Sequence, residues 1–280
     1  RLAQLRRPLD FAVVTDHAEL FGETYICDTP GVEGYDSFLC RLNRTFPKLG
    51  YMSVNSRVFQ AIGAPRYSMC GEDGSYCRSM AKGPWQETVD AAQSHYDRSA
   101  QCRFTPFIGY EWTGMPSGQK IHRNIIFRND FYQSVPTNYI DTPNAEGLWS
   151  ALESECLDRG DGCEVLAIPH NSNLSNGQLF TIEYPEGSSR SEQARLASLR
   201  ARMEPVVEMM QIKGESECKA NPWRVLGADE DCGFEKYRSL HGAEDCKGEK
   251  EWGALGGTGC SSRLDYARYA LIEGLREADR

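Results

Sequence analysis

Apolar and polar positions follow one another along the chain in two distinct periods. Short apolar runs that end in polar residues predict strands at 11–15, 104–110, 124–127, 165–168 and 206–212. Apolar residues recur with a helical period in 85–96, 144–157, 191–203 and 262–280. Strands that alternate with helices predict an α/β fold with a parallel sheet, either open or closed into a barrel.

Two long stretches interrupt this alternation. Residues 22–83 and 214–260 are rich in glycine, cysteine and turn-forming residues, and loops of this length without structure of their own are uncommon. We therefore expect them to be insertions that disulfides staple in place. The chain of 280 residues is otherwise the size of one large domain, so we expect a single domain over 1–280.

The cysteines are placed so that local bridges would close polar, glycine-rich loops. Eleven cysteines are present and none form a C-x-x-C pair, which favours disulfides over structural zinc. The spacing predicts four bridges: Cys27–Cys40, Cys70–Cys77, Cys156–Cys163 and Cys218–Cys232. A Cys246–Cys260 bridge is a weaker expectation, and Cys102 is left without a partner. This cysteine use indicates an oxidising compartment, periplasmic or extracellular.

Composition and charge narrow the kinds of partner. The hydrophobic fraction of 40% and charged fraction of 25% are ordinary for a globular protein. No apolar run approaches the roughly 20 residues that a membrane span needs. The net charge of −9 disfavours binding along a phosphate backbone. We expect a small-molecule substrate, no nucleic acid and no membrane span, whereas the oligomeric state stays open.

Metal-type side chains recur at the edges of four predicted strands. "DFAVVTDHAE" leads into His17, "FTPFIGYEW" into Glu111 and "VLAIPHNSN" into His170, while "KIHRNIIF" begins at His122. Each has an ordinary structural interpretation, such as a helix-capping histidine or a paired carboxylate. Side-chain alternation, however, places His17, Glu111 and His170 each on one strand face, toward the mouth of a predicted barrel. Their repetition predicts a site for a divalent metal ion.

The order "TDH", "GYEW", "HRN" and "IPHNSN" resembles the polymerase-and-histidinol-phosphatase (PHP) superfamily, and within it an uncharacterised family with segments like "IPHNSNLSNG" and "QIKGESEC". The resemblance implies a distorted (β/α)7-type barrel and metal-dependent hydrolysis of phosphoesters. It implies that His17, Glu111, His122 and His170 are metal ligands, with Glu111 bridging two ions. Asp16 would lie behind them or act as an occasional ligand.

The superfamily pattern also includes an H-x-H motif in the first strand and a D-x-H motif in the last, and neither occurs here. The resemblance therefore implies that 1–280 is an interior piece of a longer protein without those two strands. On that basis the isolated segment is expected to be inactive.

The remaining site candidates would contact the substrate. Lys213 follows a predicted strand and would hold a phosphate oxygen, so we expect it to be catalytic together with Glu111. Arg123 and Asn171 are further candidates for substrate contact. Imidazole and carboxylate ligands suit zinc, manganese or iron. Two alternatives to a phosphoesterase stay open: a metal-dependent hydrolase of another bond type, and a noncatalytic binding or structural module on the same barrel.

Overall fold

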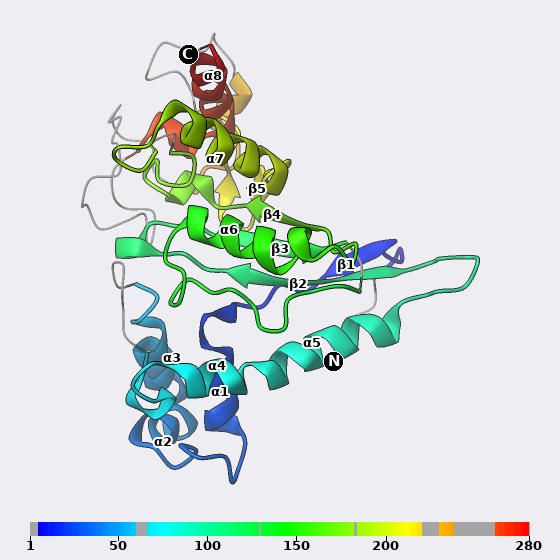
Figure 1. Cartoon of the computed structure of the whole chain (residues 1–280), viewed down its shortest axis with the longest axis vertical. Coiled ribbons are helices and arrows are strands. Elements are labelled where there is room, and N and C mark those ends of the chain that lie inside the picture. The colour runs from blue at the N-terminus through cyan, green and yellow to red at the C-terminus, as the bar shows by residue number, and fades with distance from the viewer. Residues whose placement is uncertain are drawn as a thin grey trace.

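A computed structural model describes residues 5–59, 66–128, 130–181, 184–219, 230–237 and 261–279. The fold is mixed α/β, and its main sheet has the strand order β1-β2-β3-β4 (Figure 1). The strands are β1 (Phe11–Val13), β2 (Thr105–Trp112), β3 (Arg123–Phe127) and β4 (Val165–Pro169). They confirm four of the predicted strands.

The sheet is neither parallel throughout nor closed. β1 pairs in parallel with β2, but β3 runs antiparallel to both β2 and β4. Residues 113–122 join β2 to β3, and a parallel crossover needs a dozen or more residues, so this connection forces a reversal. The strands in the described ranges form an open sheet of four. The expected (β/α)7-type barrel is therefore not what this part of the chain forms.

The reversal of β3 brings three strand ends to one edge of the sheet. Trp112 at the end of β2 lies opposite Arg123 at the start of β3, and Arg123 lies opposite Pro169 at the end of β4. Residues that follow β2 and β4 and residues that precede β3 are consequently neighbours. This edge carries the candidate site described below.

Helices form two groups at opposite ends of the molecule (Figure 1). The first group is α1 (Phe21–Asp28), α2 (Phe38–Thr45), α3 (Pro47–Asn55) and α4 (Ser75–Met80), with α5 (Lys82–His95) leading back along the sheet. The others are α6 (Ala145–Glu155), α7 (Arg190–Met203) and α8 (Ala267–Ala278). The described part of the stretch 22–83, which was expected to be loops, is thus largely helical, although its disulfides are as predicted.

Alternate strand residues make the core. Tyr110, Ile125 and Ala167 are fully buried and belong to the same apolar cluster as Trp85 of α5 and Leu148 of α6. The Trp85 ring meets the Tyr110 ring edge-on, with centroids 5.7 Å apart. Their neighbours along each strand are less buried, so the two faces of the sheet differ. The less buried face is the one that carries Glu111.

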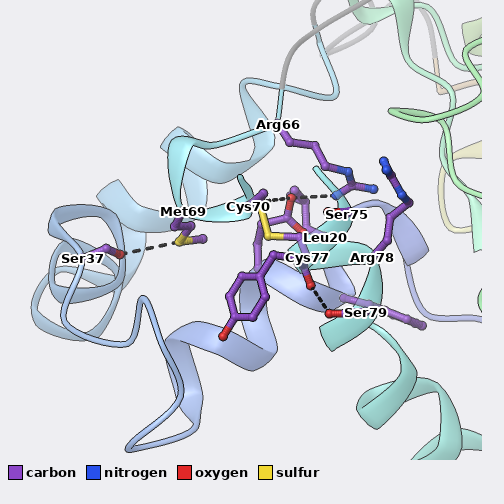
Figure 2. The surroundings of a disulfide bond; sticks show 12 residues. Leu20, Ser37, Arg66, Met69, Cys70, Ser75, Cys77, Arg78 and Ser79 are labelled. Carbon is purple, nitrogen blue, oxygen red and sulfur yellow. Dashed lines mark hydrogen bonds and ion pairs between the residues drawn. A yellow bond between two sulfur atoms is a disulfide. The ribbon is translucent and has the colours of Figure 1, made fainter. Parts of the chain in front are cut away.

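All four predicted disulfides are present. Cys27–Cys40 joins α1 to α2, and Cys70–Cys77 fixes the start of α4. Figure 2 shows the second bond, with Arg66 on one side of it and Met69 and Ser37 on the other. Cys102 has a free, exposed thiol, as expected, whereas Cys246 and Cys260 lie outside the described residues. Four bridges indicate an oxidising environment.

The predicted strand 206–212 is only partly formed. A short hairpin comprises β5 (Met210–Gln211) and β6 (Gly214–Glu215), with Lys213 in its turn. Just before it, the Glu208 amide donates to the Pro169 carbonyl at 3.1 Å, which places this segment beside the end of β4. Within the described ranges, every helix is too short or too polar to cross a membrane.

Candidate metal centre

Glu111, His122 and His170 converge at the shared strand edge. One ligand atom from each lies within 4.8 Å of the other two. His122 Nδ1 is 3.1 Å from Glu111 Oε1, and His170 Nε2 is 3.5 Å from Glu111 Oε2. The side chains are only 3%, 5% and 12% exposed for His122, His170 and Glu111. Three residues that are up to 59 positions apart in sequence therefore form one compact, largely buried group.

The strand register explains this convergence. Glu111 pairs directly with Asn124, and Asn124 pairs with Ile168. Side chains alternate along a strand, so His122 shares a face with Asn124, and His170 shares one with Ile168. All of these side chains project from the same face of the sheet near its edge.

His17 reaches the group from β1. It forms an isolated parallel bridge with Glu111, and its Nδ1 lies 3.3 Å from Glu111 Oε1. Thr113 links the two, because its hydroxyl oxygen is 2.5 Å from His17 Nδ1 and donates to Glu111 Oε1 at 3.0 Å. The His17 side chain is 68% exposed, so it lies on the solvent side of the cluster.

Protonation within the cluster is set by burial and by Glu111. Burial raises the pKa of Glu111, but hydrogen bonds from His122, His17 and His170 outweigh it and hold that pKa well below its usual range. Burial lowers the pKa of His122 to about 4, although Glu111 acts in the opposite direction. A hydrogen bond to Glu111 raises the pKa of His17 despite its partial burial. At neutral pH Glu111 is ionised and His122 is neutral, the forms in which both bind metals.

The imidazole orientations also fit a metal ion. His170 Nδ1 faces the Ile168 carbonyl oxygen at 3.4 Å, which leaves Nε2 directed at Glu111. A second contact of this kind commonly fixes the tautomer of a ligating histidine. The His122 Nε2 atom is buried without a hydrogen-bond partner among the described residues. Leaving such a nitrogen unpaired is costly, and two histidines with one carboxylate are an established ligand set.

The remaining predicted site residues take different positions. Asp16 has an exposed side chain and contributes its carbonyl, which accepts from the Glu111 amide at 2.9 Å. Asn171 is 2% exposed, has a φ of 60° and has no hydrogen-bond partner for either side-chain polar atom. Lys213 lies in the β5–β6 turn, and its carbonyl accepts from Asn173 Nδ2 at 2.9 Å.

Arg123 lies away from the cluster. Its Nε donates to Glu204 Oε1 at 2.8 Å and its Nη1 to the Ile121 carbonyl at 2.6 Å, on the helix-covered face of the sheet. That face also borders a cavity of about 1200 Å³ between α6, α7 and α8, lined in part by Arg123, Trp149 and Glu204. This cavity is thus on the other face of the sheet from the metal-type side chains. The Arg123–Glu204 ion pair is an internal contact.

Sequence reasoning missed three residues beside the cluster: Lys120, Thr113 and Asn124. Burial lowers the pKa of Lys120 to about 8, with a further contribution from the charge of Lys213. Asn124 is opposite Glu111 in the sheet and has a buried carbonyl oxygen without a hydrogen bond. Side-chain alternation counted from His122 would also select Lys120 and Asn124, two residues on either side of it.

A second group of ligand-type atoms is formed by Glu23, Cys70 and Cys77. The two sulfur atoms are joined in a disulfide and therefore cannot act as thiolate ligands. This group carries no metal chemistry.

The fold and the cluster define a mixed α/β protein with a buried group of side chains suited to hold a metal ion. The chain belongs to the family described as "Protein of unknown function (DUF3604)", whose model matches residues 1–280. No curated protein and no solved structure matches it.

This family membership corrects the resemblance to the PHP superfamily. The match over the whole chain is to a different family model and no PHP model matches, so that assignment is wrong. The expectation of two missing strands rested on the PHP pattern and loses its basis. The assignment of residues to the site therefore rests on their geometry alone.

Proposed function

We propose that Glu111, His122 and His170 hold a divalent ion and that the protein uses it to hydrolyse phosphoesters. The observation that carries the proposal is the convergence of their ligand atoms within 4.8 Å at one strand edge. A bound zinc, manganese or iron ion would lower the pKa of a coordinated water and neutralise charge on the scissile group. His17 faces the same Glu111 oxygen, so we assign it to a second ion that Glu111 shares.

The residues around the ligands support an anionic substrate. The Lys213 backbone carbonyl accepts from Asn173 Nδ2 in the loop after His170, so Lys213 lies beside the segment that carries this candidate ligand. We assign Lys213 to a phosphate oxygen. Asn171 is buried directly after His170 with an unpaired amide, and we assign it to substrate contact as well.

Other chemistries use the same ligands. Two histidines and a carboxylate also hold iron in oxygenases, and hydrolases of other bonds use similar sites. The neighbouring lysines favour an anionic ester over a neutral substrate. A noncatalytic module would need no metal at all. We also propose that the protein works in the periplasm or outside the cell, because its four disulfides persist in an oxidising compartment.

The test measures metal content and activity in the same preparations. The full-length protein is stripped with a chelator, reloaded with zinc, manganese or iron, and assayed with p-nitrophenyl phosphate. We expect at least one tightly held ion and a chelator-sensitive rate. Glu111→Gln and His170→Ala should lose both, whereas Glu186→Gln, an exposed carboxylate in a loop, should keep both.

Three outcomes would contradict the proposal. If Glu111→Gln and His170→Ala keep their metal and their rate, the site is elsewhere. Metal uptake with hydrolysis of only non-phosphate substrates would support a hydrolase of another bond. Failure of the wild-type protein to bind any divalent ion would support the noncatalytic module.

A further inference from the structure

Residues 46–52, which join α2 to α3 and form the first turns of α3, expose large apolar side chains at one end of the molecule (Figure 1). Phe46, Leu49, Tyr51 and Met52 are 57%, 55%, 68% and 67% exposed. Single exposed apolar residues are common, but four within one short segment form a patch of the kind that marks an interaction surface. We call residues 46–52 the α2–α3 tip.

The packing of α3 explains why its apolar side chains face solvent. Gly50 is buried against α2, where a Cβ built on it would lie 2.4 Å from Asn43 Cα. At 3.6 residues per turn, Lys48 and Met52 lie nearly opposite Gly50, with Leu49 between Met52 and Gly50 on one side. The helix therefore packs through its smallest residue and presents its large ones outward. Beneath it, Cys27–Cys40 ties α2 to α1, so the base of the tip is cross-linked.

The charge around the tip is opposite in sign to that of the rest of the chain. Residues 37–59 have no acidic side chain and four basic ones, Arg41, Arg44, Lys48 and Arg57. The whole chain has a net charge of −9, so all the other residues together have a net charge of −13. Arg41 and Lys48 are exposed and have no carboxylate partner among the described residues. Arg44 instead turns inward and donates to the Cys27 carbonyl at 2.7 Å.

We propose that the α2–α3 tip docks onto a lipid bilayer that contains anionic headgroups. Apolar and aromatic side chains beside lysine and arginine are the composition of segments that lie in a membrane interface, buried about 5–10 Å deep. The long stems of Arg41 and Lys48 let their charged ends stay at the level of the lipid phosphates. The same bilayer repels the acidic remainder of the chain, so the tip alone would approach the surface and set the orientation of the protein.

A second copy of the chain is a poorer occupant of this surface. A two-fold dimer through the tip would bring Lys48 and Arg41 against the same residues of the other copy. Like charges placed opposite one another at an interface are unfavourable. An anionic bilayer supplies the opposite charge and an apolar interior at the same time.

The experiment measures co-sedimentation of the full-length protein with lipid vesicles. We expect binding to vesicles of phosphatidylglycerol and phosphatidylcholine at low salt, release at high salt, and much weaker binding to phosphatidylcholine alone. The double substitution Leu49→Ser and Met52→Ser should lower the partition coefficient by about tenfold or more, because both side chains would enter the interface. Lys48→Gln should lower it by about fivefold.

The matched control is the double substitution Leu271→Ser and Leu275→Ser in α8. These leucines are 66% and 70% exposed and lie at the other end of the molecule, so this variant should bind vesicles as the wild type does (Figure 1). Metal content should be the same in all of these proteins, which separates this inference from the proposed metal site.

Three results would overturn the docking of the tip on an anionic bilayer. The first is a wild-type protein that binds neither kind of vesicle, and the second is equal binding to both kinds. The third is unchanged binding by the Leu49→Ser and Met52→Ser variant. Light scattering distinguishes the other occupant: a wild-type dimer that this variant converts to a monomer, without vesicle binding, would assign the tip to a second copy of the chain.

Discussion

At the scale of single residues, the buried carboxylates differ in what neutralises them. Glu23 is 1% exposed and pairs with Arg66 at 2.7 Å, and Glu204 pairs with Arg123 at 2.8 Å. Each of these charges has a permanent guanidinium partner, although burial still raises the pKa of Glu23. Glu111 is surrounded instead by imidazoles, of which His122 is neutral at pH 7. A largely buried carboxylate that faces imidazoles instead of a guanidinium is suited to bind a cation.

The Arg66 network gives a prediction about pH. Asp141 accepts from Arg66 Nη2 at 2.6 Å, and although burial raises its pKa, Arg66 holds that pKa below its usual value. A lowered pKa in the folded state stabilises the protein above the unfolded value of about 3.9, and this contribution is lost as the pH falls through the lower, folded pKa. Asp141→Asn should therefore cost about 1 to 2 kcal/mol at pH 7, and this cost should shrink as the pH falls below about 3.9.

Urea unfolding at a series of pH values checks this difference. Asp158→Asn removes an exposed carboxylate and should show no such dependence. A constant cost of Asp141→Asn across the whole range would mean that the ion pair with Arg66 contributes nothing to stability.

One candidate for substrate contact, Arg123, lies apart from the metal-type cluster. Arg123 directly follows the candidate ligand His122 in sequence. Neighbouring residues along a strand, however, point to opposite faces of the sheet. His122 reaches Glu111, while Arg123 pairs with Glu204 under the helices. Alternation along the strands groups His122 with Glu111 and His170 and places Arg123 on the opposite face.

At the scale of elements, four strands of the main sheet could be predicted but their directions could not. The apolar runs at 11–15, 104–110, 124–127 and 165–168 mark the strands to within a few residues. The short link of residues 113–122 favours an antiparallel pair in hindsight. The link from β3 to β4 contains α6, and a helix there usually joins parallel strands, yet this pair is antiparallel. Pairing of this kind depends on contacts far apart in sequence.

Packing between α1 and α4 gives a prediction at this scale. A Cβ built on Gly22 of α1 would lie 2.6 Å from the carbonyl carbon of Cys77 in α4, and backbone cannot yield as a side chain can. Gly22→Ala should destabilise the protein by about 1 to 3 kcal/mol. Gly274 of α8 has open space around the same position, so Gly274→Ala should stabilise it by about 0.5 to 1 kcal/mol.

Urea denaturation of both variants measures these shifts with disulfides intact. The two substitutions add the same methyl group to helical glycines, so helix propensity alone predicts the same sign for both. Stabilisation by Gly22→Ala would show that the close approach of α1 to α4 is absent in solution.

At the scale of the whole molecule, the described disulfides stabilise segments other than the strand edge that carries the cluster. Cys27–Cys40 and Cys70–Cys77 cross-link the helices α1 to α4, and closing loops of these lengths contributes about 2.5 to 3 kcal/mol each. The strand edge with Glu111, His122 and His170 has no bridge of its own. An ion bound by these three side chains would instead link the ends of β2, β3 and β4 at this edge.

A metal ion that binds only the folded protein should therefore stabilise the whole chain. At a concentration of about 100 times its dissociation constant, it adds about 2.7 kcal/mol, which raises the Tm by roughly 5 °C or more in a protein of this size. Differential scanning fluorimetry with added zinc or manganese should show this rise and its reversal by a chelator. Glu111→Gln removes the residue that all three imidazoles approach and should abolish the rise, whereas Glu186→Gln should retain it. An equal rise in Glu111→Gln would place the stabilising ion outside this cluster. The other group of ligand-type atoms in the described residues, Glu23, Cys70 and Cys77, contains a disulfide and is not expected to compete for the ion.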